Sequence, residues 1–556
     1  MTRVLNVGID FGTTFSSVFF CRPTDARVMH FENNSPTMPT LFSFYRDMRF
    51  GEPVRMLINA NPAKTIPSVV TEVKRFLGRS LKDENVRKLL TQTQNTVRDA
   101  ADVISFQIKN VATKQTYSFD PVDVAALILM DIKRVIDRAK SADEQVRAVV
   151  TVPAMFGNRQ CDALRRAVAM AGIDLVDLLK EPTAAACAYN PPDGRVLVFD
   201  FGGGTLDLSI IEVAEGRQFD VKHTDGNCFL GGNNIDYNFI ELLLRKVDEF
   251  EDDALSQKVR RRRAELKHIC ERMKIQFSND FHTKRRRGMT YAAIVPTLSQ
   301  TFELDTLFKG RSEEYFDYDV EITYEEFAAA NREVFEETRR CVRRALEQSR
   351  FAARDITSVL MVGGTCNCPE VYRILTEEFG EAKIIDPKDQ LTLLVCKGAA
   401  MFCQNRGMLG VESARVGNIL TYDIGIRHFD VYQRCYFIET ILERNTRLPA
   451  RKREVCVTIE DFQKSVEFEL FENGKPLDVF RIDNIPLQLA HTVEIEVDVL
   501  VDSDGTISVT ARVIKPSDAA CQGQCKVVAQ NKSLLQFSTE ARTKELQDLY
   551  LRFTHL

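Results

Sequence analysis

Two segments of the chain repeat one arrangement of residues that could hold an anion. Residues 7–18 read VGIDFGTTFSSV, and residues 197–210 read LVFDFGGGTLDLSI. In each segment an apolar strand ends in Asp-Phe-Gly, passes through a turn of small residues, and returns as a β-branched, apolar run. Glycine and threonine at a hairpin tip let backbone N–H groups approach an anion without intervening side chains. Asp10 and Asp200 stand at the same place in both segments.

These paired hairpins predict a site for a metal–polyphosphate group that is gripped from both sides. The aspartate beside each tip would serve the metal, and the glycine turns would face the phosphates. The alternative is a pair of ordinary buried hairpins with turn glycines, but Asp, Gly and Thr recur together, which favours a site. The sequence has neither a GxxxxGK[ST] loop nor a GxGxxG turn after a strand, which excludes P-loop and dinucleotide sites.

Length and composition indicate a large globular protein. At 556 residues the chain is too long for a single core, and such a length predicts about three to four domains. Its composition, 44% hydrophobic and 28% charged, is typical of folded proteins. A net charge of −5 gives no general electrostatic reason to expect nucleic acid. The basic clusters Arg260–Arg263 and Lys284–Arg287 leave that role open, although charge runs on helices are usually solvated faces.

The sequence predicts a cytoplasmic protein without a secretory signal or membrane span. The longest apolar stretches, such as Val124–Met130, are far too short to cross a bilayer. The 14 cysteines form no CxxC pair. Cys366 and Cys368, and likewise Cys521 and Cys525, have no histidine near them at ligand spacing, which disfavours a metal site. Free thiols fit a reducing compartment better.

The first 410 residues alternate between strands and helices, which predicts an α/β architecture. Apolar periodicity predicts helices over Val122–Lys140, Arg159–Ala171, Phe239–Phe250, Ser256–Phe277 and Tyr324–Gln348. Short apolar runs predict strands over Ala148–Val152, Val196–Phe199 and Ser358–Val362. The last of these strands runs into a third glycine turn, in LMVGGT (360–365).

Residues 418–515 predict a β-sandwich. Strictly alternating runs over 493–501 and 507–513 flank an Asp-Ser-Asp-Gly turn, and runs over 455–459 and 466–470 precede an Asn-Gly turn. Several short strands with turns at this spacing are typical of a sandwich. One further helix is predicted over 538–552, with Ser538 as its cap.

The aspartate hairpins and the third glycine turn describe the actin-like architecture of sugar kinases, actin and the seventy-kilodalton heat-shock chaperones. The chain resembles the heat shock protein 70 family, whose motifs it carries in order and spacing: VGIDFGTTFSSV (7–18), KRFLGR (74–79), AVVTVPAMF (148–156), EPTAAACAY (181–189), FDFGGGTLDLSI (199–210), FLGGNNID (229–236) and VGGT (362–365). The sandwich, with RNTRLP (444–449), resembles the family's substrate-binding domain, which a sugar kinase would not carry.

The resemblance implies four parts: an actin-like ATPase domain over 1–410, a linker over 411–417, a substrate-binding sandwich over 418–515, and a truncated helical lid over 516–556. It implies ATP and Mg²⁺ as cofactors. It also implies extended or unfolded client polypeptides as partners, with J-domain proteins and nucleotide-exchange factors as possible helpers.

The resemblance also assigns roles within the ATPase domain. The phosphates would lie against Gly12, Thr13, Thr14, Gly202, Gly203 and Gly204, and Thr205 would touch the γ-phosphate. Asp10 and Asp200 would hold the hydration shell of Mg²⁺. Lys74 would reach the terminal phosphate, with Glu181 and Asp207 orienting the attacking water or the metal's shell. The alternative for Lys74 is an ordinary surface lysine.

The nucleoside side departs from the family pattern. Glu271, Lys274 and Ser278 match the helix that holds the adenosine, and Gly363 and Gly364 match the glycine tip beside it. Ile275 and Asn367, however, stand where the family has two stacking arginines. The loss of two cation–π stacks predicts weaker ATP binding or looser base choice.

Coupling between the two parts is also expected to be weak. The linker reads VESARVG, which is polar where the family's linker is rich in leucine. Pro153 matches the family's relay proline, but Cys161 takes the place of the relay arginine, with Arg159 two residues away. Because allosteric coupling energies are only about 1–3 kcal/mol, such changes could erase nucleotide control of client release.

Two functions remain open at this stage. The first is a slow ATPase and chaperone that binds apolar peptides. The resemblance implies that Ile426, Phe429, Val466 and Phe468 form the peptide pocket, although alternating apolar residues could equally be sandwich core. The second is an assembly or movement scaffold that uses the sandwich as an interaction surface, as in the short-lidded relatives encoded by filamentous plant viruses of the closterovirus type. The sequence GTTFSS (12–17) and the chain length resemble those relatives.

Overall fold

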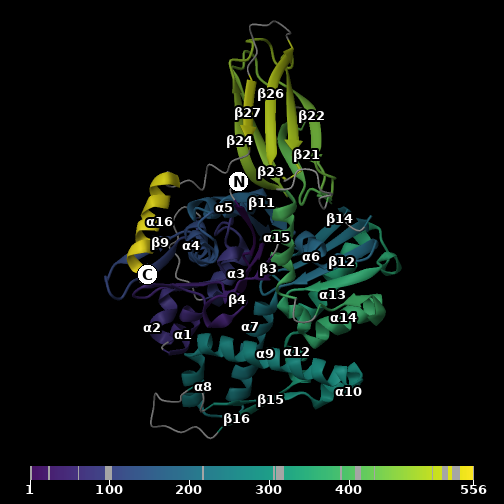
Figure 1. Ribbon diagram of the computed structural model, residues 1–556. Helices are drawn as coiled ribbons and strands as arrows, with labels where there is room; N and C mark the ends of the chain where they lie inside the picture. The colour runs from purple at the N-terminus through teal and green to yellow at the C-terminus, as the bar shows by residue number, and fades with distance from the viewer. Residues whose placement is uncertain are drawn as a thin grey trace.

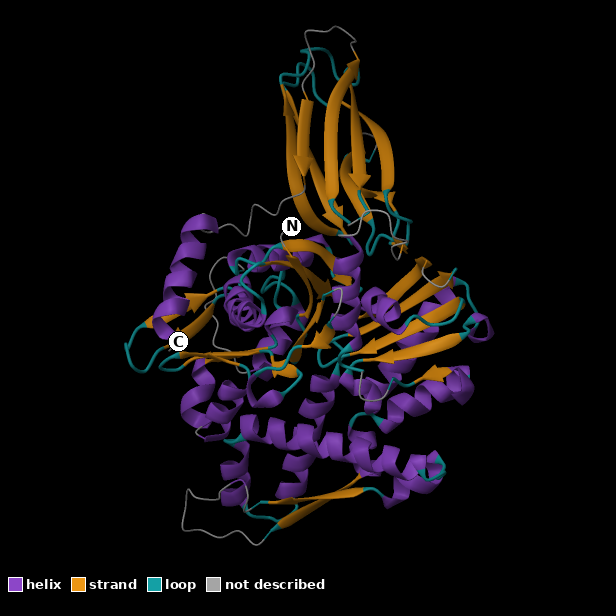
Figure 2. Ribbon diagram, viewed as in Figure 1, coloured by secondary structure: helices purple, strands orange, loops and turns teal. Residues whose placement is uncertain are grey.

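Two α/β lobes lie side by side, and a β-sandwich projects from them (Figure 1). The lobes mix helices with strands, whereas the projecting part is built of strands (Figure 2). The predicted order of an α/β part, an all-β part and a short C-terminal helix is confirmed. The computed structural model describes residues 3–22, 25–60, 62–93, 103–215, 218–304, 307, 318–387, 391–406, 415–430, 433–503, 505–515, 524–528 and 539–554.

The first lobe is built on a sheet of order β11-β10-β1-β2-β3, in which β4 also pairs with β2. Its strands are β1 (Arg3–Asp10), β2 (Phe15–Cys21), β3 (Ala26–Val28), β4 (Thr37–Pro39), β10 (Glu144–Val152) and β11 (Leu175–Lys180). β1 and β2 form the predicted hairpin, and β10 runs parallel to β1 on its other side. Buried apolar residues on both faces of β1 make it a central strand.

Smaller elements complete the first lobe. They are the sheet β6 (Met48–Phe50), β5 (Leu41–Phe44) and β7 (Val69–Thr71), the hairpin β8 (Phe106–Lys109) and β9 (Thr116–Phe119), the 3₁₀ turn η3 (Val73–Arg75), and helices α1 (Glu52–Ala60), α2 (Pro62–Thr65), α3 (Glu84–Thr93), α4 (Pro121–Ala139) and α5 (Asn158–Met170). The Asp120 side chain caps α4 by accepting from the Asp123 N–H, and Pro121 occupies the first turn.

The second lobe repeats the plan with a sheet of order β18-β17-β12-β13-β14-β19. Its strands are β12 (Gly194–Phe201), β13 (Leu206–Ala214), β14 (Gln218–Asn227), β17 (Ser358–Val362), β18 (Ile384–Ile385) and β19 (Arg415–Gly417). Around it lie the hairpin β15 (Ser299–Glu303) and β16 (Asp319–Thr323), the turn η6 (Gly364–Asn367), and helices α7 (Gly232–Asp248), α8 (Asp253–Arg260), α9 (Arg263–Arg286), α10 (Tyr291–Ile294), α12 (Tyr324–Ala330), α13 (Arg332–Ser349) and α14 (Pro369–Phe379).

Two of the predicted helices are broken in the structure. The helix expected over Ser256–Phe277 divides into α8 and α9, and the one expected over Tyr324–Gln348 divides into α12 and α13 at Asn331. Asn331 is fully buried, and its side-chain amide donates to the Phe327 carbonyl at 3.0 Å. An asparagine side chain that bonds the backbone competes with helical hydrogen bonds, which explains the break.

Helices α6 (Glu181–Tyr189) and α15 (Leu394–Arg406) pack against each other between the two lobes. Small residues permit this close approach: a Cβ on Gly398 would lie 1.8 Å from the Ala184 carbonyl oxygen, and one on Gly8 would lie 2.1 Å from the Cys396 carbonyl oxygen. The lobes are therefore joined by closely packed helices.

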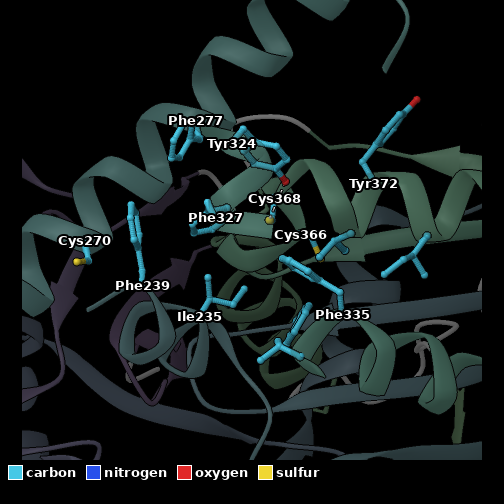
Figure 3. Close-up of a cluster of buried hydrophobic side chains, with 14 of the residues drawn as sticks. Ile235, Phe239, Cys270, Phe277, Tyr324, Phe327, Phe335, Cys366, Cys368 and Tyr372 are labelled. Carbon is cyan, nitrogen blue, oxygen red and sulfur yellow. Dashed lines mark hydrogen bonds between the residues drawn. The ribbon is translucent and has the colours of Figure 1, made fainter. Parts of the chain in front are cut away.

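A cluster of buried aromatic side chains in the second lobe packs around α9 (Figure 3). Phe277 on α9 packs edge-on against Tyr324, and Phe239 on α7 packs edge-on against Phe327. Cys366 and Cys368 lie buried at the edge of the same cluster. Burial raises the pKa of the Cys368 thiol to about 11, so both thiols fit an apolar packing role.

The sandwich consists of two four-stranded sheets of order β21-β20-β23-β24 and β22-β25-β26-β27. Their strands are β20 (Ile424–Asp430), β21 (Cys435–Leu442), β22 (Ala450–Val457), β23 (Ser465–Glu472), β24 (Lys475–Asp483), β25 (Glu494–Val501), β26 (Ile507–Lys515) and β27 (Gln524–Val528). The predicted alternation holds, since Ile495, Val497, Val499 and Val501 all point into the core. Asn473 and Gly474 form the predicted turn, both with positive φ.

The sandwich is docked on the lobes. The Glu472 carboxylate accepts from the Asn158 backbone N–H at 3.0 Å and from its side-chain amide at 2.7 Å, at the start of α5. The Tyr422 hydroxyl donates to the Met155 carbonyl at 2.7 Å. Arg444 donates to the Thr224 carbonyl at 2.5 Å. These bonds link the sandwich to both lobes.

The linker also docks, against the expectation from its polarity. Arg415–Gly417 form β19, which pairs in parallel with Gln218–Asp220 of β14. Strand pairing uses backbone groups, so polar side chains do not prevent it. Residues 411–414, Cys521 and Ser538 lie outside the described residues, as does the side chain of Cys525.

Helix α16 (Thr539–Phe553) packs on the first lobe, away from the sandwich (Figure 1). Leu546 and Tyr550 are buried in the core of that lobe, and the Phe553 ring meets the Phe44 ring edge-on at 4.9 Å. Burying a large apolar side chain contributes about 1.5–3 kcal/mol, so this contact is substantial. Within the described part of the chain, every helix is too short or too polar to cross a bilayer.

Candidate functional site

A cavity of about 350 Å³ between the two lobes gathers most of the predicted site residues. The first lobe contributes the end of β1, the β1–β2 turn and η3, and the second lobe contributes the β12–β13 turn, α9 and the loop after β17. The predicted residues that line the cavity are Asp10, Gly12, Thr13, Thr14, Lys74, Glu181, Asp200, Gly202, Gly203, Gly204, Thr205, Glu271, Lys274, Gly363 and Gly364.

Two predicted residues lie just behind the cavity wall. Asp207 is buried, and its carboxylate accepts from the Met155 backbone N–H at 3.1 Å. Ser278 lies one turn further along α9 than Lys274, and its hydroxyl donates to the Lys274 carbonyl at 3.1 Å. Asp207 thus bonds a segment behind the cavity, whereas Ser278 bonds the backbone of Lys274, which lines the cavity.

The two hairpin tips touch each other across the cavity. A Cβ on Gly203 would lie 1.9 Å from the Thr14 hydroxyl oxygen, and one on Gly231 would lie 2.4 Å from the Gly203 carbonyl oxygen. The start of α7 packs under the second tip, where the Asn233 N–H donates to the Gly203 carbonyl at 2.8 Å. Only glycine fits this contact, which explains the glycine-rich tip in terms of packing as well as anion access.

Lys74 is buried inside an acidic cluster. Its side chain is almost fully enclosed, and its ammonium group donates to the Glu181 carboxylate at 2.5 Å. On the opposite side the Thr151 hydroxyl donates to the Asp10 carboxylate at 3.3 Å. A buried, carboxylate-paired lysine contradicts the alternative of an ordinary surface lysine.

Three aspartates of this cluster, Asp10, Asp200 and Asp207, have raised pKa values. Burial, followed by the neighbouring Glu181 carboxylate, raises the pKa of Asp10 to about 7 and the pKa of Asp207 to about 7. Burial together with Glu181, Asp207 and Asp10 raises the pKa of Asp200 well above its usual value. Lys74 opposes each of these shifts but does not cancel them. The cluster is therefore short of positive charge.

These shifts predict how the stability of the ligand-free protein depends on pH. Folded Asp10 and Asp207 keep their protons up to about pH 7, whereas the unfolded chain releases them near 3.8. Because the folded state binds more protons in this window, the free energy of unfolding falls as the pH rises through it, by about 1 kcal/mol per carboxyl between pH 6 and 8. Calorimetry should show a lower unfolding midpoint at pH 8 than at pH 6, and Asp207→Asn should reduce the difference. A midpoint that rises over this range contradicts the prediction.

The cluster suits a hydrated divalent cation. Among the described residues, no three acidic, histidine or cysteine side chains converge closely enough to hold a metal directly. Mg²⁺ keeps several waters and uses one or two carboxylates together with substrate phosphates. Asp10 and Asp200, with raised pKa values and oxygen donors facing one cavity, fit that mode of binding.

The nucleoside end of the cavity has a cation, but it is already paired. The Lys274 ammonium contacts the buried Asp236 carboxylate at 2.6 Å and donates to the Gly232 carbonyl at 3.3 Å. Ile275, 48% exposed, and Asn367 line the same end. The backbone oxygen of Asn367 bonds the His282 ring nitrogen at 2.9 Å. A base would thus meet an aliphatic side chain and an amide at these two positions.

The sequence matches the family described as Hsp70 protein over residues 6–546. The chain belongs to the Hsp70 family. Members of this family are chaperones that bind and hydrolyse ATP with Mg²⁺.

Several curated Hsp70 proteins are similar over most of their length. A heat shock protein of Pyricularia oryzae is 29% identical over 524 residues, which cover 91% of this chain and 79% of that protein. A ribosome-associated molecular chaperone of Saccharomyces cerevisiae is 28% identical over 524 residues, with the same coverage. The chaperone protein DnaK of Thermotoga maritima is 28% identical over 528 residues, covering 91% of this chain and 78% of that protein.

The four residues predicted to bind peptide in this Hsp70 divide into two groups. Ile426 and Phe468 are buried in the sandwich core, and Phe468 stacks on Phe480 at 5.0 Å. Phe429 and Val466 are half-buried, with Phe429 edge-on to Tyr436. In this arrangement only the second pair offers surface, and the peptide-binding role stays a prediction.

Pro153, which the resemblance predicts to be a relay, lies in a segment that contacts the sandwich through Met155. Pro153 is buried, and its carbonyl accepts from the Phe156 N–H at 3.1 Å. The Cys161 thiol makes a long contact to the Phe156 carbonyl, at 3.9 Å, and packs against the first-lobe core. Arg159 instead reaches the sandwich, where it donates to the Pro476 and Leu477 carbonyls.

The sequence did not predict three contacts at the site. Thr151 bonds Asp10, the Met155 backbone bonds Asp207, and Asp236 holds Lys274. All three lie in motifs that the resemblance singled out, AVVTVPAMF and FLGGNNID. Thr151 reaches Asp10 because β10 lies beside β1, and Asp236 reaches Lys274 because α7 lies beside α9. The Met155 contact requires the two lobes to meet, and none of these proximities follows from local sequence.

Proposed function

We propose that this Hsp70 is an ATP-hydrolysing chaperone that binds extended apolar peptide segments and couples nucleotide to peptide only weakly. The observation that carries the ATPase part is the buried Lys74–Glu181 pair, set among three carboxylates with raised pKa values, opposite two touching glycine tips. Phosphoryl transfer requires positioned cations and little covalent chemistry, and this cluster supplies that setting.

Each group in the cavity has a distinct task in this proposal. Backbone N–H groups at both tips, with Thr13, Thr14 and Thr205, bind the phosphates, and Lys74 neutralises the terminal one. Asp10 and Asp200 hold the hydrated Mg²⁺, which supplies positive charge against the negative charge spreading in the transition state. Glu181 and Asp207 orient the attacking water and accept its proton. Burial, followed by the neighbouring Glu181 carboxylate, raises the pKa of Asp207 to about 7, which suits proton acceptance near neutral pH.

ATP affinity is expected to be lower than is usual in the family, because Ile275 and Asn367 give no cation–π contact. Ile275→Arg should tighten ATP binding by about tenfold, since one such contact is worth about 0.5–2 kcal/mol. Isothermal titration calorimetry at fixed ionic strength measures the change. Met289→Arg, at an exposed position just beyond α9, controls for added charge. Sub-micromolar ATP binding by the unmodified chain contradicts the prediction.

Client release is expected to respond little to nucleotide. The connection between the site and the sandwich rests on backbone hydrogen bonds and a few polar pairs. The polar side chains of the linker and the long Cys161 contact add little to it. Adding ATP should change the off-rate of a bound fluorescent apolar peptide by less than about fivefold, the lower limit of ordinary allosteric coupling. Stopped-flow anisotropy measures it, and a change of a hundredfold would rule the weak coupling out.

The chaperone role is tested with a denatured client. Purified protein with ATP, Mg²⁺ and a J-domain helper should suppress client aggregation, and Lys74→Ala should remove any ATP dependence. Failure to suppress aggregation of several unrelated clients, combined with intact ATP hydrolysis, contradicts the chaperone role and leaves the ATPase role in place.

A second candidate is a scaffold that uses the sandwich as an interaction surface. The edge strand β21 favours it, because Tyr436, Phe437 and Ile438 are 57%, 44% and 43% exposed in succession. An edge strand with apolar side chains on both faces is suited to pairing with a partner strand. Co-purification with one defined assembly, abolished by charged substitutions on β21, would favour this role over general client binding.

A further inference from the structure

A second cavity lies within the first lobe. Its volume is about 260 Å³, which is near the lower end of the range for sites that bind small molecules. The connection between β3 and β4, strand β4, the junction of β6 with α1, and the middle of α4 surround it. Thr37 of β4 borders both this cavity and the one between the lobes, but the charged residues that line the two are different.

The walls of this cavity are held by the fold itself. In the β3–β4 connection the Phe31 N–H donates to the Ser35 carbonyl at 2.8 Å, and the Ser35 hydroxyl donates to the Thr37 carbonyl at 2.7 Å. The other walls are formed by α4 and β4, whose apolar residues belong to the core of the lobe. The cavity is therefore preformed, as sites for small molecules usually are.

Apolar side chains supply one part of the lining. Met38 and Phe50 are buried, whereas Phe31 and Val135 are half-buried against the same core. An occupant with a hydrocarbon part would remove further apolar area of these side chains from water, which is favourable. The lining therefore favours a molecule that is partly hydrocarbon.

Carboxylates outnumber basic groups in the rest of the lining. The Asp131 side chain on α4 is 10% exposed, whereas those of Glu52 and Glu32 are 30% and 61% exposed, so Asp131 lies deepest. Within the described part of the chain Arg134 is the one basic residue that lines the cavity, and its Nη2 contacts Asp131 at 2.7 Å. Arg55 contacts Glu52 at 3.4 Å from outside the lining. An anion would meet three carboxylates and a guanidinium that is already paired, which disfavours it.

The Asp131 carboxylate can accept further hydrogen bonds. The Tyr550 hydroxyl donates to its Oδ1 at 3.2 Å, and Arg134 contacts the same oxygen. A carboxylate can accept about four hydrogen bonds in all. Burial raises the pKa of Asp131 even though Arg134 opposes the shift. A second positive charge beside Asp131 would therefore be stabilised.

An elongated organic cation fits this arrangement better than a metal ion. Among the residues that the structure describes, no three acidic, histidine or cysteine side chains converge closely enough to hold a metal. The carboxylates instead lie at different depths along a partly apolar cavity. An ammonium group donates three hydrogen bonds, and an attached hydrocarbon chain packs against apolar side chains as a lysine stem does.

We propose that this cavity binds a linear aliphatic diamine, with one ammonium group at Asp131 and the other at Glu52 and Glu32. The hydrocarbon chain between the two groups lies against Phe50 and Val135. Binding here needs no nucleotide, so this site and the proposed ATP site stand or fall separately.

The first test is calorimetric titration of the full chain with cadaverine, a five-carbon diamine, at low ionic strength and without nucleotide. The dissociation constant should be below about 1 mM. Pentylamine, which lacks the second ammonium group, should bind at least about tenfold more weakly, and glutarate, a five-carbon dianion, should not bind. Equal affinity for pentylamine, or binding of glutarate, overturns the proposal. The absence of both heat and thermal stabilisation at about 10 mM cadaverine also overturns it.

A matched pair of variants on α4 locates the bound amine. Asp131→Asn keeps the shape of the side chain and should weaken cadaverine binding at least about tenfold, because a hydrogen bond to a charged group is lost. Asp137→Asn removes the same charge from the same helix, but Asp137 pairs with Lys133 at 2.5 Å and does not line the cavity. Its affinity should stay within about twofold of that of the unmodified chain. Equal effects of the two substitutions overturn the proposal.

Two further variants keep the test decisive. Glu52→Gln, nearer the rim, should weaken binding by about threefold, and it carries the test if circular dichroism shows that Asp131→Asn is not folded. Asp10→Asn, in the cavity between the lobes, should leave cadaverine affinity within about twofold. A loss in Asp10→Asn as large as that in Asp131→Asn would place the amine between the lobes and overturn the proposal, as would unchanged binding in Glu52→Gln.

Discussion

Lys74→Ala should lower the rate of ATP hydrolysis by about 10²–10³, the usual cost of removing one positioned charge from a transition state. The Lys74 ammonium sits 2.5 Å from the Glu181 carboxylate and opposes proton uptake by Asp10 and Asp207. Its removal leaves the cluster without that cation and the terminal phosphate without its counter-charge. Single-turnover hydrolysis at saturating ATP and Mg²⁺ measures the loss.

ATP affinity and folding should change much less than the rate. Backbone groups at both tips still bind the phosphates, so the dissociation constant should stay within about tenfold. Lys88→Ala, at an exposed position on α3, is the matched control for loss of one lysine. Circular dichroism confirms that the variant is folded. Hydrolysis within threefold of the unmodified chain would remove Lys74 from the mechanism.

Gly203→Ala should separate the two hairpin tips and weaken ATP binding by about 100-fold, since a displacement near 1 Å at a binding centre has effects of that size. The added Cβ would lie 1.9 Å from the Thr14 hydroxyl oxygen, far inside contact distance. Rotation of the Thr14 hydroxyl does not relieve this clash, because the added Cβ would also lie 2.9 Å from the Thr14 Cβ, and the Thr14 carbonyl is held by the Thr40 N–H at 2.8 Å. Calorimetric titration with Mg·ATP measures the loss.

Gly202→Ala is the matched control in the same turn. Its Cβ would meet nothing closer than the Thr205 carbonyl oxygen at 3.8 Å, which is an ordinary contact. This variant should fold normally and keep more of its ATP affinity than Gly203→Ala. Equal effects of both substitutions would mean that the tips are not held by the Gly203–Thr14 contact.

The paired hairpin motifs and the family resemblance together predicted most of the residues that line the cavity. Asp10 and Asp200, the glycine tips, Lys74 and Glu181 were all predicted, and they line one cavity. Local patterns also set the strands of the sandwich and its Asn473–Gly474 turn, because alternation and turn chemistry act over a few residues. Helix bounds were less predictable. The break at Asn331 depends on a side chain that bonds the backbone only once it is buried.

The linker docks although its composition predicted that it would not. Its polar residues predicted poor docking, yet Arg415–Gly417 add a strand to the second lobe. Side-chain polarity says little about a backbone ladder at a sheet edge, since the neighbouring strand supplies the partner. The same holds for Arg159, which reaches the sandwich carbonyls although Cys161 replaces the expected arginine.

By itself the sequence determined the family, the order of an α/β part and an all-β part, and most of the residues that line the cavity, because those depend on short motifs with fixed backbone needs. Only the tertiary structure decided where α16 lies, which carboxylates share the field of Lys74, and which apolar sandwich residues face the core. These are long-range matters: an amphipathic helix fits any apolar groove, and a carboxylate's pKa depends on neighbours that lie far away in the chain. Residues 123 and 542, separated by more than 400 positions, meet only in the folded molecule.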